Sequence, residues 1–126
     1  MLLLDTHTFL WFEDNNTKLP EKVKEEIETN SEVFVSIASF WEMAVKNSIG
    51  KLNLTASVTE LMEDCAEFGF AILPINGRHL DRLTKLPWTH RDPFDRLLIC
   101  QAQEENLTLV TADATIKQYD VANFWQ

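Results

Sequence analysis

The sequence predicts an α/β fold, a three-layer α/β/α sandwich with a central, mainly parallel sheet of about five strands. Short apolar runs, beginning with Leu2, Leu3 and Leu4, alternate along the chain with segments of helical periodicity. This alternation is typical of a parallel sheet whose strands are connected by helices. The 126 residues are 45% hydrophobic and show no internal repeat or shift in composition. We therefore expect a single domain over residues 1–126 with a buried core.

The strands are predicted at short segments that are mostly apolar and flanked by turn or capping residues. In chain order they cover residues 2–5, 33–35, 70–73, 107–110 and 121–125. Helices are predicted between them at residues 6–14, 20–28, 39–48, 58–68, 76–83 and 93–106, with a further helical turn near residues 114–119.

Three kinds of residue mark the expected helix ends. They are the N-cap candidates Ser39 and Asn76, the first-turn prolines Pro20 and Pro93, and the stop glycines Gly50 and Gly69. The segments at residues 51–56 and 87–92 are predicted to be loops.

Four carboxylates stand where apolar strands are followed by helices. They are Asp5, Glu42, Asp95 and Asp113. Two of them follow strands, and the other two lie early in helices on faces that should meet the sheet. The apolar residues on those faces are Ala38, Val45 and Ile49 for Glu42, and Leu98, Ile99 and Ala102 for Asp95. Because strand C-termini and helix N-termini share one edge of a parallel sheet, the four acids should meet there.

Each of these acids also has an ordinary structural explanation. Asp5 and Asp113 are suitable N-caps, and Glu42 follows Ser39 by three residues, which is the spacing of a capping box. A carboxylate on an apolar helix face is costly unless it is paired. Two such acids, together with two more at the same predicted edge, favour one shared site.

A fifth acid, Asp92, competes with Asp95 for the role of metal ligand. Asp92 precedes Pro93 and is a possible ligand, but we assign it to the helix cap because Asp95 lies on the inward face. Crowded like charges require a neutralising cation. Ligands that are all oxygen suit Mg2+ or Mn2+ better than zinc.

Small polar residues and histidines lie near the acids. Thr6, Ser39 and Thr111 fit either as caps or as groups that orient the carboxylates and hold metal-bound water. The histidines have no metal-ligand spacing, and structural or exposed roles are expected for His7, His79 and His90.

Positive charge is concentrated in one segment of an acidic chain. Eleven Lys and Arg residues against 20 Asp and Glu give a formal net charge of −9, which alone argues against a general nucleic-acid binder. Residues 76–96 nevertheless hold five basic and three acidic residues. The basic ones are Arg78, Arg82, Lys85, Arg91 and Arg96.

Cysteine usage and hydropathy favour a cytoplasmic protein that does not enter a membrane. Cys65 and Cys100 are isolated and have no metal-ligand spacing, so we expect reduced thiols. No apolar run approaches the roughly 18 residues of a membrane span. The first five residues lack the basic region of a signal peptide and are expected to form a strand instead.

Five stretches occur in the order and at the spacing of one known family: residues 2–11 (LLLDTHTFLW), 36–46 (SIASFWEMAVK), 50–52 (GKL), 90–99 (HRDPFDRLLI) and 107–113 (LTLVTAD). With them the chain resembles the PIN-domain ribonucleases, in particular the VapC-type toxins of bacterial toxin–antitoxin pairs. The resemblance covers nearly the whole chain. Asp92 belongs to a variant motif, Asp-Pro-Phe-Asp, so its role transfers less securely than those of the other acids.

The resemblance implies a metal-dependent endoribonuclease that hydrolyses RNA phosphodiester bonds. Asp5, Glu42, Asp95 and Asp113 would be its catalytic acids around Mg2+ or Mn2+. The basic segment 76–96 would then hold the RNA backbone, or else form ordinary solvated surface. The alternatives are a PIN-like module that binds RNA or protein without cleaving, and a phosphatase with Asp5 as nucleophile. The phosphatase is disfavoured because residue 7 is His, where such folds usually carry a second acid.

The resemblance also implies a co-expressed antitoxin and, commonly, a homodimer. Two early helices carry more aromatic residues than one small core obviously needs. They are Phe9, Trp11, Phe12, Phe40 and Trp41. Aromatic residues are enriched at the centres of interfaces, so this surplus favours a partner surface, with inward packing as the alternative.

Overall fold

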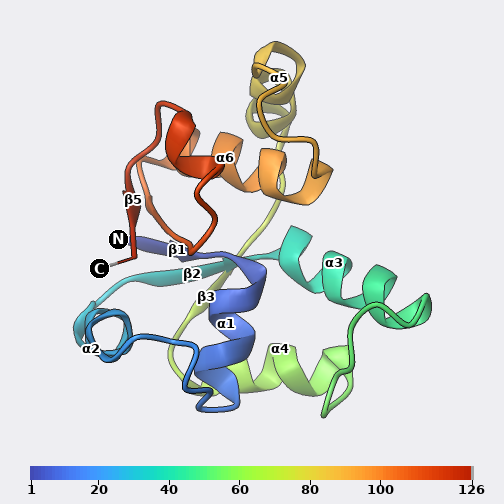
Figure 1. The fold of residues 1–126 in the computed structure, drawn as a ribbon, viewed down its shortest axis with the longest axis vertical. Helices are drawn as coiled ribbons and strands as arrows, with labels where there is room; N and C mark the ends of the chain where they lie inside the picture. The colour runs from blue at the N-terminus through green and yellow to red at the C-terminus, as the bar shows by residue number, and fades with distance from the viewer. Residues whose placement is uncertain (126) are drawn as a thin grey trace.

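The computed structural model describes residues 1–125 as a five-stranded parallel sheet with helices on both faces (Figure 1). The strands are β1 (Leu2–Leu4), β2 (Val33–Ser36), β3 (Ala71–Leu73), β4 (Thr108–Val110) and β5 (Asn123–Phe124). The helices are α1 (Thr6–Glu13), α2 (Glu21–Thr29), α3 (Ile37–Ser48), α4 (Val58–Glu67), α5 (Gly77–Lys85) and α6 (Pro93–Glu105), with a 3-10 turn η1 (Ile116–Gln118). The predicted three-layer architecture is confirmed.

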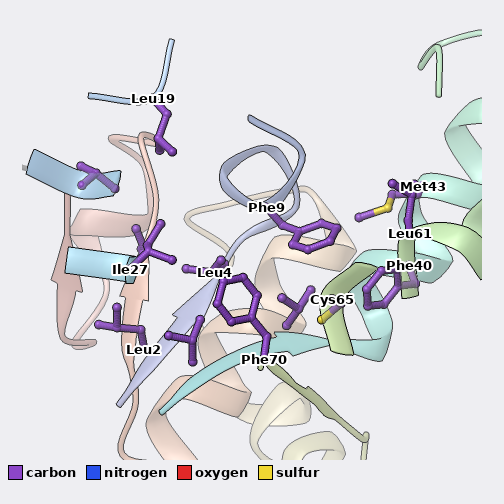
Figure 2. Packing of buried hydrophobic residues seen from close by; sticks show 14 residues of the cluster. Leu2, Leu4, Phe9, Leu19, Ile27, Phe40, Met43, Leu61, Cys65 and Phe70 are labelled. Atoms are coloured by element: carbon purple, nitrogen blue, oxygen red, sulfur yellow. The ribbon is translucent and has the colours of Figure 1, made fainter. Parts of the chain in front are cut away.

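The two faces of the sheet pack on separate cores. Leu2 and Leu4 of β1 face a core formed with α1, α2, α3 and α4, whereas Leu3 faces a core formed with α6 and the segment around η1. Figure 2 shows the first core, in which the rings of Phe9 and Phe40 lie edge to face at 5.6 Å between centroids. Burying each such side chain contributes about 1.5–3 kcal/mol. A strand buried on both faces explains why the first run is continuously apolar rather than alternating.

Strand order creates a crevice beside β1. The sheet order is β3-β2-β1-β4-β5, so the chain builds outward from β1 on one side and then crosses to the other. Leu4 of β1 is in register with Val35 of β2 and with Val110 of β4. Ligands of open α/β sheets bind outside the carboxyl ends of the strands where the order reverses. Here that point lies just beyond β1 and β4.

Two expected helix starts were wrong by a few residues. Ser36, not Ser39, caps α3, and its hydroxyl oxygen accepts the N–H of Ala38 at 3.0 Å. The cap falls there because β2 leads directly into the helix, leaving no connecting loop. Pro20 is the N-cap of α2 rather than its first helical residue.

The C-terminal ends of α3 and α4 have the expected stop glycines, but one residue near the end of α3 is not buried as expected. Gly50 and Gly69 have φ of +74° and +83°, the left-handed conformation that a stop glycine supplies. Ile49, expected on the inward face with Glu42, is 60% exposed because the C-terminal end of α3 extends beyond the sheet (Figure 1). None of the helices within residues 1–125 is long and apolar enough to cross a lipid bilayer.

Candidate metal centre

Asp5 both caps α1 and faces the crevice. Its Oδ1 accepts the N–H of Thr8 at 2.9 Å, and its Oδ2 accepts the hydroxyl of Thr111 at 2.6 Å. The second bond is possible because β1 and β4 are neighbours, so their C-terminal residues meet. Burial raises the pKa of Asp5 above its ordinary value, although the hydrogen bonds from Thr111 and Thr8 work in the opposite direction.

Glu42 is buried on the crevice side of α3. Its Oε1 accepts the hydroxyl of Thr6 at 2.5 Å, and its Oε2 lies 2.5 Å from Nζ of Lys46, one helical turn further on. Ser39, by contrast, bonds no carboxylate. It lies inside α3, and its buried hydroxyl has no hydrogen-bond partner within residues 1–125. The structure therefore places Thr6 beside the acids as expected but does not place Ser39 there.

Asp92 and Asp95 divide two roles at the start of α6. Oδ1 of Asp92 accepts the N–H groups of Phe94 and Asp95 at 2.9 and 3.4 Å, which makes it the N-cap as predicted. Oδ2 of Asp92 still lies 3.8 Å from Nζ of Lys46. Burial raises the pKa of Asp95 to about 7, with the charges of Asp92, Glu42 and Asp5 acting in the same direction. The carboxylates are therefore close enough to repel one another.

Asp113 closes the opposite side of the crevice. Its Oδ1 accepts the N–H of Thr115 at 2.8 Å, and its Oδ2 lies 2.7 Å from Nε2 of His90. Its own N–H donates to the hydroxyl of Thr111, which in turn donates to Asp5. Burial acts to raise the pKa of Asp113, but the hydrogen bonds from His90 and Thr115 outweigh it and lower the value.

These acids surround one cavity of about 280 Å³ at the carboxyl edge of the sheet. The carboxylates that line it are Asp5, Glu42, Asp92, Asp95 and Asp113. The donor set is therefore made of carboxylate oxygens held in place by neighbouring hydrogen bonds, and Asp95 is kept from ionising freely by burial and by the other charges. A hard divalent cation such as Mg2+ or Mn2+ matches this set, because it prefers oxygen ligands and would relieve the repulsion.

Three basic side chains, His7, Lys46 and His90, line the cavity but were not assigned to the site from the sequence. Lys46 lies between Glu42 and Asp92, and His90 lies between Asp113 and Asp95, 3.2 Å from Oδ2 of the latter. The spacing of four residues between Glu42 and Lys46 was a usable signal, since such pairs meet on a helix face. His90 left no such signal because it lies in a loop. The structural or exposed role expected for His90 did not include this contact with the acids.

The basic residues of segment 76–96 lie on α5, on the loop that follows it and on α6. Arg78, Arg82 and Lys85 lie on α5, which is separated from α1 and α4 by the rest of the molecule (Figure 1). Arg82 forms an ion pair with Glu104 at 2.6 Å. None of these three lines the acidic cavity. Arg91 is exposed in the loop next to it.

The expectation that Arg96 belongs to an exposed basic surface was wrong. Its side chain is only 3% exposed and donates to the carbonyl oxygens of Pro87, Leu86 and His90. The guanidinium also lies 3.8 Å from the centroid of the Trp88 ring. Arg96 points away from Asp95 because consecutive residues of a helix are turned by about 100°. It holds the loop at residues 86–92 in place.

Comparison with known protein families matches the PIN domain over residues 2–122. The chain therefore belongs to the PIN domain family, and the resemblance seen in the sequence motifs is confirmed. A comparison with curated proteins gives no match.

Several solved structures share the fold over nearly the full length of both chains. VapBC2 from Rickettsia felis, bound to a DNA fragment from its promoter, has a TM-score of 0.74 at 15% identity and covers 99% of this chain and 98% of that one. A toxin–antitoxin complex from Klebsiella pneumoniae has a TM-score of 0.67 at 17% identity, covering 98% and 96%. FitAcB from Neisseria gonorrhoeae has a TM-score of 0.65 at 20% identity, again covering 98% and 96%.

Proposed function

We propose that this PIN domain, taken as one domain over residues 1–126, is a metal-dependent endoribonuclease and the toxin component of a toxin–antitoxin pair of VapC type. The observation that carries the proposal is the group of carboxylates around one cavity, with the pKa of Asp95 raised to about 7 by burial and by its acidic neighbours. Acids held this close together are costly unless they bind a cation. Membership of the PIN family supports a nuclease.

The proposed metal ligands are Asp5, Glu42, Asp95 and Asp113. When bound, Mg2+ or Mn2+ would polarise the scissile phosphate and lower the pKa of a water molecule. The protein contributes the geometry in which this chemistry takes place. Thr111 and Thr6 fix the orientation of Asp5 and Glu42 through hydrogen bonds of 2.6 and 2.5 Å. Lys46 balances charge between Glu42 and Asp92.

RNA would reach the cavity along basic side chains outside it. Arg91 is the best placed, because it is exposed and lies between His90 and Asp92, which both line the cavity. Arg78, Arg82 and Lys85 on α5 would contact phosphates further along the strand. Such contacts release counterions, so binding should weaken as salt rises.

The partner proposal rests on an exposed tryptophan as well as on the fold. Trp41 is 59% exposed and packs edge to face on Phe94, with the ring centroids 5.0 Å apart. Phe9 and Phe40, by contrast, pack inward, so only part of the predicted aromatic surplus is available to a partner. We propose that an antitoxin or a second copy of the chain covers Trp41. We also propose that the protein acts in the cytoplasm. The similar structure from K. pneumoniae is a toxin–antitoxin complex.

The nuclease is tested by incubating the purified protein with RNA and, separately, with single-stranded DNA. Cleavage of RNA should require Mg2+ or Mn2+ and should stop in EDTA. It should also stop in each of the variants Asp5→Ala, Glu42→Ala, Asp95→Ala and Asp113→Ala. Glu63→Ala, which removes an exposed acid of α4, is the matched control and should cleave normally.

One outcome would revise the ligand set and another would overturn the proposed function. Cleavage that survives in Asp95→Ala but is lost in Asp92→Ala would move the ligand role to the capping residue. No metal-dependent cleavage of any RNA, with the fold intact, would indicate a PIN domain that binds without cleaving. Sequencing the 5′ ends of transcripts after expression would identify the target RNA and the cleaved bond.

A further inference from the structure

The loop at residues 86–92 is anchored where it carries His90 into the cavity. Arg96 of α6 donates to the carbonyl oxygens of Leu86 and Pro87 at 3.1 and 2.7 Å. The hydroxyl of Tyr119, which follows η1, donates to the carbonyl oxygen of Pro87 at 2.7 Å and accepts the N–H of His90 at 2.7 Å. Two buried side chains from separate elements therefore fix the backbone that presents the imidazole.

The hydrogen bonds of the ring determine which nitrogen carries its proton. Nδ1 of His90 accepts the backbone N–H of Asp92 at 3.1 Å, so Nδ1 is unprotonated. The proton therefore lies on Nε2, because a neutral imidazole carries one proton. Nε2 lies 2.7 Å from Oδ2 of Asp113 and 3.2 Å from Oδ2 of Asp95. At this site the ring donates to Asp113 and lies beside the carboxylate of Asp95.

We propose that His90 is a positioning residue that holds Asp95 and Asp113 together, because its Nε2 hydrogen is donated to Asp113 and lies beside Oδ2 of Asp95. The inference rests on the proposed function, because it concerns the same metal site. Asp95 comes from the first turn of α6 and Asp113 from the loop after β4, so no backbone hydrogen bond joins the two within residues 1–125. Their carboxylates offer oxygens within 4.8 Å of each other, and without a donor between them they would repel and move apart.

The same geometry argues against His90 as a metal ligand. Nε2 of His90 and carboxylate oxygens of Asp95 and Asp113 lie within 4.8 Å of one another, which by distance alone would suit a metal ion. A ligating nitrogen must be unprotonated, however, and Nε2 becomes unprotonated only if the proton moves to Nδ1. That move would replace the bond from Asp92 by a contact between two N–H groups. His90 thus acts from outside the metal, through the acids.

The test measures Mn2+ affinity by electron paramagnetic resonance of the free ion, which needs no enzymatic activity. His90→Leu removes the donor, and the affinity should fall by about 10- to 100-fold, as when other outer partners of ligands are lost. His90→Gln keeps an amide N–H near the position of Nε2 and should retain affinity within about threefold of wild type, well inside that range. Thr89→Leu, at the exposed neighbouring position, is the control and should bind like wild type.

A second measurement separates positioning from ligation. Pulsed electron paramagnetic resonance of bound Mn2+ detects directly coordinated 14N, and the wild-type spectrum should contain no imidazole coupling. A coupling that disappears in His90→Gln would make His90 a ligand and overturn the proposal. Wild-type affinity in His90→Leu would also overturn it while leaving the proposed metal site standing. If the wild-type protein itself binds no Mn2+, the proposed function and the positioning role fall together.

Discussion

Replacing Asp95 by Asn should stabilise the metal-free protein at alkaline pH. Asp95 has an ordinary pKa of 3.8, which burial and the charges of Asp92, Glu42 and Asp5 raise to about 7 in the folded state. Between these two values the folded protein holds a proton that the unfolded chain releases. The stabilising effect of this proton is therefore complete below pH 4 and is lost as pH rises through 7. Above pH 7 the ionised group opposes folding.

The size of the effect follows from the two pKa values. At about 1.4 kcal/mol per pH unit, the difference corresponds to at most about 4 kcal/mol. The Asp95 side chain is 18% exposed, so solvent screens part of the repulsion, and we expect about 2–4 kcal/mol. The amide of the Asp95→Asn variant keeps an oxygen near Nε2 of His90, so the substitution removes charge with little loss of contact.

The assay is urea unfolding of the metal-free wild type and Asp95→Asn at pH 4 and pH 8, in EDTA. The variant should be more stable by about 2–4 kcal/mol at pH 8, and the difference should fall below about 1 kcal/mol at pH 4. Glu63→Gln, at an exposed position on α4, should show no such pH dependence. In a separate titration without EDTA, Mn2+ at 100 times the wild-type Kd should stabilise the wild type by about 2.7 kcal/mol. The same Mn2+ concentration should stabilise the variant by less. Equal stability of the two proteins at pH 8 would refute the crowding of the acids.

Three further variants test residues outside the proposed metal ligands. Neutralising Arg82, Lys85 and Arg91 together should weaken RNA binding and flatten its salt dependence, with Mn2+ affinity unchanged; an unaltered salt slope in a filter-binding assay would make them ordinary surface. Arg96→Ala should instead lower the free energy of unfolding by about 2–4 kcal/mol, because it leaves the buried carbonyl group of Leu86 without its donor and removes the bonds to Pro87 and His90. Thermal unfolding at constant pH measures this loss. Trp41→Ser should weaken association with a partner by about 2 kcal/mol or more while leaving cleavage intact, and light scattering after size exclusion measures the association. A wild-type protein that stays a strict monomer and gains no mass from any antitoxin would contradict this prediction.

Local sequence was sufficient to predict most helices and strands, because the ends of each element depend on residues within a few positions of it. The start of α6 illustrates this. Asp92 accepts the N–H groups of the first turn, Pro93 needs no such acceptor, and both properties are visible within four residues. The predicted start of α3 was wrong because Ser36 and Ser39 are both suitable N-caps when only their near neighbours are considered. The choice between them depended on where β2 ends, which its pairing with β1 and β3 decides.

The same distinction applies to the site. The convergence of Asp5 and Asp113 follows from the parallel order of strands, and that order follows from the alternation of strands and helices. Thus the sequence by itself determined the fold class, the edge of the sheet that carries the site, and the acids gathered there.

Only the tertiary structure decided that His90 joins the acids and that Arg96 does not. His90 reaches Asp113 across 23 residues, on a loop whose path is set by Arg96 and Tyr119. Arg96 is next to Asp95 in the chain, yet it lies beneath the loop rather than in the cavity. These placements depend on the direction of each side chain and on contacts between distant segments, and neither is encoded in the spacing of residues along the chain.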